Sequence, residues 1–245
     1  FSHWRKYRPL GITCAATLVD GADPKCWFST TENGGIFPSM VRPDLVNLVN
    51  YLSSLTNSGY KIVTWNGLVF DFDGLAEESG MWDECRAIAL NHIDMMFHLF
   101  CRLGYPLSLD KAAKGAGLAG KPDDISGELA PAYWLAERYQ QVFDYVKQDV
   151  IMTLQVAKSV YSSGKISWVS NRGRNTLVRL NNGWLTVNQA QKLPLPDNSW
   201  MSSHMQRDDF FGWTRINPTE VHQKVFSTQQ NETTLASENI STKLM

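Results

Sequence analysis

Ile62-Val63-Thr64-Trp65-Asn66-Gly67-Leu68-Val69-Phe70-Asp71 is the stretch of sequence that decides the expected fold. Its first half is apolar and rich in β-branched residues, which predicts a short buried strand, and Asn66-Gly67 predicts the turn that ends it. Asp71 then stands where the next helix begins. Because open α/β sheets bind ligands at the carboxyl ends of their strands, Asp71 is the first candidate site residue.

The elements predicted on either side of this stretch describe the middle of an α/β sheet. Residues 11–19 and 25–31 are predicted to form two antiparallel strands. A helix with one apolar face is predicted from residue 43 to about 57, and mainly helical patterns run from 71 to 160. A strand pair, a crossover helix and another strand indicate an α/β architecture.

The last of these helices, predicted over about 131–160, carries the second group of candidates. Its apolar stripe consists of Val142, Val146, Val150, Leu154 and Ala157. Tyr145 and Asp149 lie off this stripe and one helical turn from each other. A carboxylate here, aimed at the strand end that carries Asp71, would complete a site of oxygen ligands, which Mg²⁺ prefers.

Charge is divided along the chain, although the net charge is only −1. Residues 67–150 hold fourteen acids against seven bases, whereas residues 165–192 hold five bases and no acid, together with two tryptophans. Acidic clusters suit cations, and a basic segment with aromatic residues suits a polyanion such as a nucleic acid. Solvated surface with the tryptophans in the core is an equally open interpretation. Within the basic segment, 176–180 and 184–187 are predicted to form a hairpin around a turn at 181–183.

Composition excludes several classes of protein. Of the 245 residues 43% are hydrophobic and 19% are charged, which is enough to build a core and argues against wholesale disorder. No apolar stretch approaches the roughly eighteen residues of a membrane span. The four cysteines form no Cys-x-x-Cys pair and no cluster with histidine, which argues against a zinc site and against a disulfide-stapled secreted module. A reducing, cytoplasmic location is therefore expected.

Two motifs carry a resemblance to a known family. The segment from Asn66 to Asp71 resembles the second motif of the DEDD family of 3′–5′ exonucleases, in which Asn, an aromatic residue and Asp recur in that order. Tyr145-x-x-x-Asp149 resembles the third motif in its tyrosine form, the DEDDy branch that includes the proofreading domains of family B DNA polymerases. Segments 92–96 and 108–113 also stand in the order that such domains use between these motifs. The resemblance covers about residues 10–160.

The resemblance implies an RNase H-like fold and a two-metal hydrolytic site. Four carboxylates would hold two divalent cations, Mg²⁺ or Mn²⁺, with Asp71 and Asp149 as two of the ligands. Tyr145 would orient the attacking water, while Asn66 and Phe70 would contact the substrate. The expected substrate is a single-stranded 3′ end, of DNA rather than RNA, bound also by Arg172, Arg174 and Arg179. A polymerase or another replication or repair protein is the implied partner, and no membrane is involved.

The sequence departs from the family pattern at its first motif. The two remaining carboxylates are expected from an Asp-x-Glu on the first strand of the sheet, and none precedes Gly11. Since the chain begins with Phe1, truncation is the simplest account, and divergence to an inactive homologue is the alternative. We expect the 245 residues alone to hydrolyse nucleic acid weakly or not at all. The rival function is a catalytically inactive nucleic-acid-binding or scaffold domain of the same fold.

Three parts are expected along the chain. An RNase H-like mixed sheet flanked by helices, with its first strand missing, occupies residues 1–163; a small, basic, β-rich appendage occupies 164–216; and a polar, disordered tail occupies 217–245.

Each candidate site residue also has an ordinary structural explanation. Asp71 is a suitable helix N-cap, Asp149 a solvated helix residue, and Tyr145 a packed ring with its hydroxyl at the surface.

Overall fold

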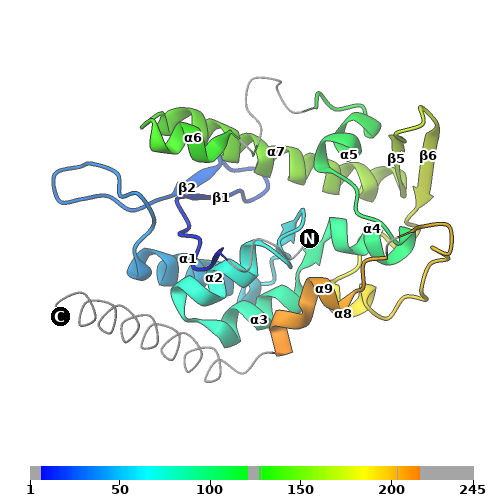
Figure 1. Cartoon of the computed structure of the whole chain (residues 1–245), viewed down its shortest axis with the longest axis horizontal. Helices are drawn as coiled ribbons and strands as arrows, with labels where there is room; N and C mark the ends of the chain where they lie inside the picture. Colours follow the sequence, from blue (N-terminus) through cyan, green and yellow to red (C-terminus); the bar gives the residue numbers. More distant parts are fainter. Residues whose placement is uncertain (1–6, 121–126, 128, 203, 216–245) are drawn as a thin grey trace, which may run out of the picture. The chain divides into compact units, whose positions relative to one another are not determined.

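The computed structural model describes residues 7–120, 127, 129–202 and 204–215 (Figure 1). The helices are α1 (Arg42–Asn57), α2 (Asp71–Ser79), α3 (Trp82–Asn91), α4 (Met95–Leu103), α5 (Leu109–Gly115), α6 (Ala130–Leu135), α7 (Tyr139–Ser163), α8 (Val187–Ala190), α9 (Asp208–Phe211) and the 3₁₀ turn η2 (Gly212–Arg215). The strands are β1 (Ala15–Thr17), β2 (Lys25–Trp27), β3 (Val63–Thr64), β4 (Ile93–Asp94), β5 (Lys165–Val169) and β6 (Asn175–Arg179). The predicted tail, 217–245, lies outside the described residues.

The chain divides into two units, Phe1–Phe210 and Phe211–Met245. The described part of the second unit is a single turn, in which the Thr214 hydroxyl donates to the carbonyl of Phe211 at 2.7 Å. The Arg215 guanidinium lies 4.8 Å from the centre of the Phe211 ring. All candidate site residues belong to the first unit.

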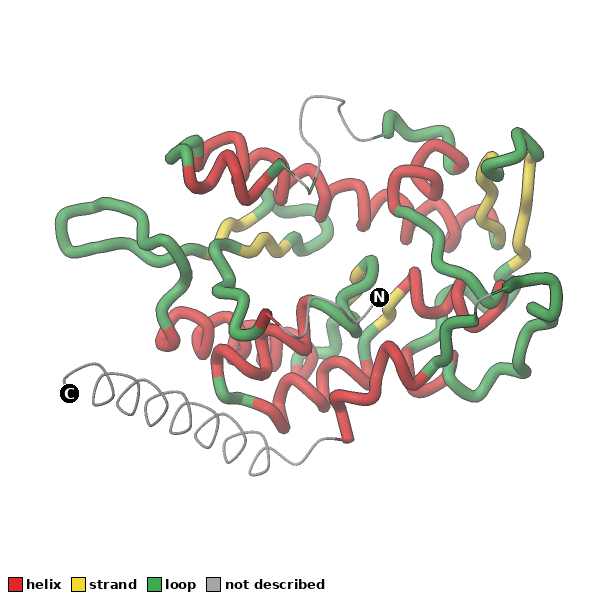
Figure 2. Tube along the Cα trace, in the orientation of Figure 1, coloured by secondary structure: helices red, strands yellow, loops and turns green. Residues whose placement is uncertain are grey.

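The predicted α/β architecture is confirmed, although the strands are short (Figure 2). The described residues form three two-stranded sheets: β1 antiparallel to β2, β3 parallel to β4, and β5 antiparallel to β6. The pairing of β1 with β2 and the helix α1 appear where the sequence predicts them. Pro43 and Asp44 in the first turn of α1 favour its start there, because proline needs no hydrogen-bond partner for its nitrogen and an acid complements the helix dipole.

Strand β4 is one of the elements that the sequence analysis missed. It consists of two residues between the helices α3 and α4, and it pairs with β3 in the register Val63 with Ile93 and Thr64 with Asp94. A two-residue strand is too short to show any periodicity of its own. Its position is fixed by tertiary contacts, which are described with the site below.

The helix predicted over 131–160 is in fact two helices, and that prediction is wrong at this point. α6 ends at Leu135 and α7 begins at Tyr139, with Glu137 in a left-handed conformation (φ 58°) between them. The break lets the Trp134 ring pack edge-on against Tyr139, with 4.8 Å between ring centres. Packing of aromatic residues has therefore overridden a continuous helical pattern.

Helix α7 is the element around which the first unit is organised. It packs against β1, β2, β3 and β5. In Figure 1, α6 and α7 run along one side, α1, α2 and α3 lie on the other, and β1 and β2 lie between them. Within the predicted apolar stripe of α7, Val142 and Ala157 are buried, while Val146, Val150 and Leu154 are only partly buried.

The predicted hairpin of 176–180 with 184–187 is wrong. Residues 175–179 pair instead with the preceding segment 165–169, around a turn in which the amide of Ser170 donates to the carbonyl of Arg174. Ile166 and Trp168 alternate inward on β5, which fixes this register.

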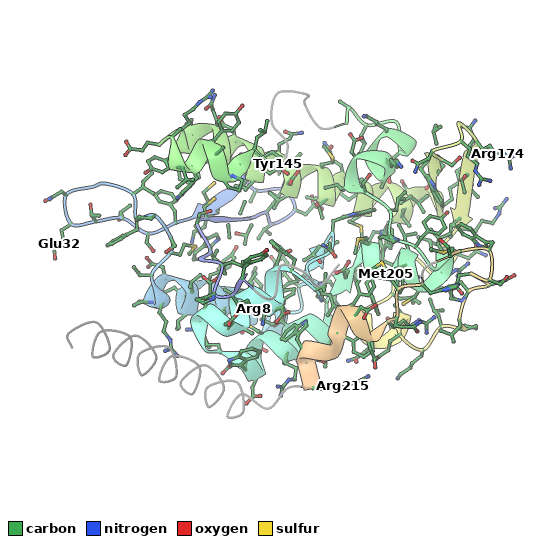
Figure 3. The ribbon with its side chains drawn as sticks, viewed as in Figure 1. Arg8, Glu32, Tyr145, Arg174, Met205 and Arg215 are labelled. Atoms are coloured by element: carbon green, nitrogen blue, oxygen red, sulfur yellow. The ribbon has the colours of Figure 1, made fainter. Side chains whose placement is uncertain are left out.

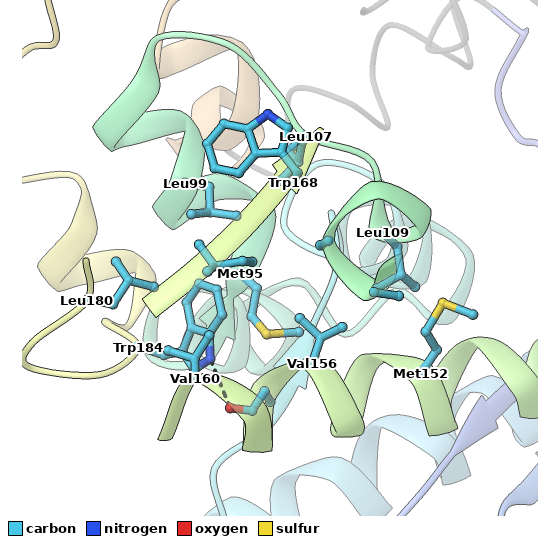
Figure 4. Close-up of a cluster of buried hydrophobic side chains, with 14 of the residues drawn as sticks. Met95, Leu99, Leu107, Leu109, Met152, Val156, Val160, Trp168, Leu180 and Trp184 are labelled. Carbon is cyan, nitrogen blue, oxygen red and sulfur yellow. Dashed lines mark hydrogen bonds between the residues drawn. The ribbon is translucent and has the colours of Figure 1, made fainter. Parts of the chain in front are cut away.

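Trp184 packs onto α7 instead of pairing with β6. Its indole nitrogen donates to the carbonyl of Ala157 at 3.3 Å (Figure 4). Trp168, Trp184 and Leu180 share one buried cluster with residues of α4, α5 and α7. The tryptophans of the basic segment therefore belong to the core, as the structural interpretation of that segment expected.

In the part of the chain that is described, no helix has both the length and the apolar character needed to cross a membrane.

Candidate functional site

The loop that follows β3 is built on the carboxylate of Asp94, at the end of β4. One Asp94 oxygen accepts hydrogen bonds from the amides of Asn66 (3.1 Å) and Phe97 (3.0 Å), and the other accepts from Leu68 (2.9 Å). Asp94 is buried and also serves as the N-cap of α4. A single carboxylate thus holds the turn after β3 and the start of α4 together, which positions Asp71.

The Asn66-Gly67 turn has a local steric explanation. Asn66 has a left-handed backbone (φ 73°), which asparagine tolerates better than most residues. A β-carbon at Gly67 would lie 2.6 Å from the Thr64 hydroxyl, so only glycine fits there. The amide oxygen of Asn66 is buried and has no hydrogen-bond partner.

Asp71 is the first residue of α2. The N-cap is Phe70, and no side chain caps the helix, so the interpretation of Asp71 as an N-cap is wrong. The Asp71 side chain is accessible from a cavity, and the protein that lines this cavity removes much of the water around the carboxylate. The pKa of Asp71 is raised from its ordinary 3.8 to about 7, first by this loss of solvent and then by repulsion from Asp94 and, less strongly, from Asp149.

Tyr145 and Asp149 lie one turn apart on α7, and both are partly buried. Figure 3 labels Tyr145 on this helix. Both line the same cavity of about 1770 Å³ as Asp71. A β-carbon at Gly127 would lie 3.1 Å from the Tyr145 hydroxyl oxygen, so position 127 limits where this phenol can move. Repulsion by Asp149 is the last of the contributions that raise the pKa of Asp71, as expected for two carboxylates on one cavity.

Seven of the eight residues that the sequence analysis named line this one cavity. They are Asn66, Phe70, Asp71, Tyr145, Asp149, Arg172 and Arg174. Arg172 and Arg174 belong to the turn between β5 and β6, and Figure 3 shows Arg174 well away from Tyr145. Arg179 does not line the cavity; it lies at the other end of β6, opposite Lys165. The structure therefore separates Arg179 from the other two arginines.

Asp94 is the residue of the site whose role sequence reasoning missed. The segment 92–96 was noted for its order in the chain, but no role was given to its acid. An acid at the end of a second short strand is the signal that would have identified it, and that signal depends on recognising β4.

The described residues provide only part of a metal centre. Among them, no group of three or more His, Cys, Asp or Glu side chains is arranged to hold a metal ion. Asp71 and Asp149 are two carboxylates of the four that the family resemblance implies, and Asp94 is committed to three backbone amides. A complete two-ion centre does not fit this donor set.

We expect Asp71→Asn to stabilise the protein in metal-free buffer at neutral and higher pH. The raised pKa means that the folded protein disfavours the ionised form of Asp71. Ionisation of Asp71 therefore destabilises the fold. This destabilisation is absent below about pH 4, grows as the pH rises and is complete above about pH 7. The melting temperature of Asp71→Asn should exceed that of the wild type at pH 8 and match it at pH 4. Glu32→Gln, at an exposed position, is the control; equal melting temperatures for Asp71→Asn and wild type at both pH values would contradict the assigned electrostatics.

Comparison with known proteins gives one match. The family model of the RNase_H superfamily matches residues 40–161, so this part of the chain is similar to an RNase H-like domain. That superfamily generally hydrolyses phosphodiester bonds of nucleic acids, and the match indicates nuclease-type activity and nucleic-acid binding. No curated protein and no solved structure matches the chain. The matched segment contains Asp71, Tyr145 and Asp149.

Proposed function

We propose that this protein is a metal-dependent 3′–5′ exonuclease of the DEDDy type, acting on single-stranded ends of DNA rather than RNA. The observation that carries the proposal is the shared cavity, which brings an acid at a strand end together with a tyrosine and an acid from a helix 74 and 78 residues further along the chain. Such a convergence of residues distant in sequence is typical of catalytic sites.

Asp71 and Asp149 are the proposed metal ligands in the described part of the chain. RNase H-like domains typically use divalent metals. A divalent cation held there would activate water and polarise the scissile phosphate. Because two carboxylates are half of the implied set, metal binding by these residues alone should be weak and should depend on oxygens of the substrate phosphate.

The remaining residues have proposed roles in holding water and substrate. The Tyr145 hydroxyl would accept or donate a hydrogen bond to the attacking water. Phe70, which is exposed and lines the cavity, offers a ring on which a terminal base can stack. Asn66 also lines the cavity and is the second proposed contact to the substrate.

Arg172 and Arg174 are proposed to bind phosphates of the strand, whereas Arg179 is not. We expect Arg172→Gln combined with Arg174→Gln to reduce the slope of log affinity against log salt by about 1.4 on single-stranded DNA, since each phosphate contact contributes about 0.7. Arg179→Gln is the matched control on the same hairpin and should leave the slope unchanged. Fluorescence anisotropy of a labelled oligonucleotide measures this slope. An unchanged slope in the double variant would show that the turn makes no phosphate contacts.

The rival function is a nucleic-acid-binding or scaffold domain without catalysis. The incomplete donor set favours it. A binding domain would have the same fold and the same basic turn as the exonuclease. It would hydrolyse no nucleic acid, whichever divalent metal is added. A replication or repair protein as partner and a cytoplasmic location stay predictions from sequence.

The experiment that decides between them uses one oligonucleotide labelled at either end. With Mn²⁺ or Mg²⁺ and protein in excess, a 3′–5′ exonuclease releases a 3′ label at once as a mononucleotide and shortens a 5′-labelled strand one nucleotide at a time. DNA and RNA versions of the strand give the substrate preference. Internal fragments from the start would contradict the exonuclease proposal, and intact strands with retained binding would support the rival.

A further inference from the structure

One exposed tryptophan lines the cavity that contains the carboxylates. Trp200 lies in the loop between α8 and α9 (Figure 1), and 67% of it is exposed. The other tryptophans of the described residues are buried or partly buried. Because single exposed aromatic rings are common on protein surfaces, the support of this ring and its surroundings decide what it can do.

Arg207 holds the start of this loop against α4. Its guanidinium donates to the carbonyl of Cys101 on α4 at 3.2 Å. It also donates, at 2.6–2.8 Å, to three carbonyls of the loop, those of Gln191, Leu193 and Pro194. Hydrogen bonds from a charged donor are stronger than those between neutral groups, so this part of the loop is firmly anchored.

Gly104 and Tyr105, which follow α4, support the part of the loop next to Trp200. A β-carbon at Gly104 would lie 3.1 Å from the β-carbon of Asn198, so the loop approaches this glycine closely. The ring centres of Tyr105 and Trp200 lie 6.0 Å apart, and the two rings are nearly perpendicular (77°), which is a favourable arrangement. Trp200 is therefore supported by a second ring while most of its surface stays exposed. A ligand that stacks on it has little side-chain motion to restrict.

A continuous wall of the cavity connects Trp200 to the loop that presents Asp71. Leu107, two residues after Tyr105, accepts a hydrogen bond from the indole nitrogen of Trp65 at 3.0 Å. Trp65 directly follows β3 and begins the loop that leads to Asp71. Tyr105, Leu107 and Trp65 all line the cavity. A strand of nucleic acid whose end reaches Asp71 can run along this wall to Trp200.

The charges on this part of the cavity fit a polyanion. Arg172 and Arg174 are exposed, and Lys111 donates a hydrogen bond to the turn that carries them. All three bases line the cavity. Asp110 also lines it, but this acid forms an ion pair with Lys114 at 2.8 Å. Basic residues that bind phosphates, together with an aromatic ring that stacks on a base, are typical of single-strand binding sites.

We propose that Trp200 is a stacking platform for one unpaired base of single-stranded DNA, on the 5′ side of the nucleotide held at Asp71. This proposal rests on the proposed nucleic-acid function and adds a subsite to it. Arg172 and Arg174 bind the phosphates, and Trp200 binds a base between them and the carboxylates or beyond them. Every base has a flat π-face, so this subsite adds affinity without a sequence preference.

The first test is the affinity for a 5′-labelled oligothymidine, measured by fluorescence anisotropy in EDTA so that no strand is hydrolysed. Trp200→Ala should weaken binding at least about fivefold, because stacking of one base on an aromatic ring contributes that much or more. The slope of log affinity against log salt should equal that of the wild type, since the indole carries no charge. Trp200→Phe keeps an aromatic ring and should recover most of the lost affinity.

Leu195→Ala is the matched control. Leu195 lies on the same loop and is 80% exposed, but it does not line the cavity, so this variant should bind as the wild type does. Equal affinities of Trp200→Ala and the wild type, or equal losses in Trp200→Ala and Leu195→Ala, would overturn the proposal. A change of oligomeric state in Trp200→Ala without loss of affinity would assign the ring to a protein interface and would also overturn it.

An abasic scan of the oligonucleotide identifies the base that stacks on Trp200. Removing this base should weaken binding by the wild type and should cause no further loss in Trp200→Ala, because the variant has already lost the same contact. Removing any other base should affect both proteins equally. Abasic effects that are identical in the two proteins at every position would contradict the proposal. A protein that binds through Trp200 and hydrolyses no strand when metal is added would contradict only the exonuclease proposal.

Discussion

Asp94→Ala should lower the free energy of unfolding by about 3–5 kcal/mol. The substitution leaves the buried amides of Leu68 and Phe97 and the partly buried amide of Asn66 without their common acceptor. Each unsatisfied buried donor costs about 1–3 kcal/mol. Asp94→Asn keeps one carbonyl oxygen and should cost less. Urea unfolding followed by circular dichroism gives both values.

The control for Asp94 is Asp83→Ala, which removes an ion pair with Arg86 on the surface of α3. The Asp83 side chain is 86% exposed, so the cost should stay within about 0.5 kcal/mol. If Asp94→Ala costs no more than Asp83→Ala, the carboxylate of Asp94 does not hold the loop that presents Asp71, and the structural account of the site is wrong.

Asp149→Ala should reduce the hydrolysis of single-stranded DNA at least about 100-fold, whatever rate the wild type reaches with Mn²⁺. Asp149 is one of the two proposed metal ligands, and the described residues offer no third carboxylate to replace it. Loss of one member of a catalytic group removes most of the rate enhancement that the group provides. The measurement is nucleotide release from a 3′-labelled strand with protein in excess.

Asp144→Ala is the matched control for Asp149, because Asp144 lies on the same helix but is exposed and accepts a hydrogen bond from Gln140 at 2.7 Å. Its hydrolysis rate should equal that of the wild type. Undiminished hydrolysis by Asp149→Ala would refute the assignment of the site, and equal losses in both variants would point to a general effect on α7.

Sequence alone predicted the mixed α/β class and the positions of β1, β2, α1 and β3, because periodicity and turn residues act locally. The sequence analysis was wrong for elements whose position depends on contacts between residues distant in the chain. β4 has two residues and is positioned by the Asp94 carboxylate. The break before α7 depends on how Trp134 packs. The hairpin partner of β6 was misassigned because Trp184 packs against α7, which sequence periodicity does not show.

The candidate site followed the same rule. Asp71, Tyr145 and Asp149 were identified from motif spacing, since a strand end and a helical turn are local features. Arg179 lies apart from Arg172 and Arg174 because of the register in which β5 pairs with β6. The sequence analysis predicted a different hairpin and so could not show this separation. The raised pKa of Asp71 was also out of reach, because it arises from enclosure by the cavity and from the charges of Asp94 and Asp149. The roles of all these residues in hydrolysis stay predictions.

Mn²⁺ titration followed by NMR tests most directly whether Asp71 and Asp149 form one metal-binding site. Paramagnetic broadening should appear together at the amides around Asp71 on α2 and around Asp149 on α7, and it should strengthen when a single-stranded oligonucleotide is added. Either Asp71→Asn or Asp149→Asn alone should abolish broadening at both places, because the two carboxylates hold the ion jointly. Broadening at one carboxylate that persists after the other is neutralised would contradict the shared site.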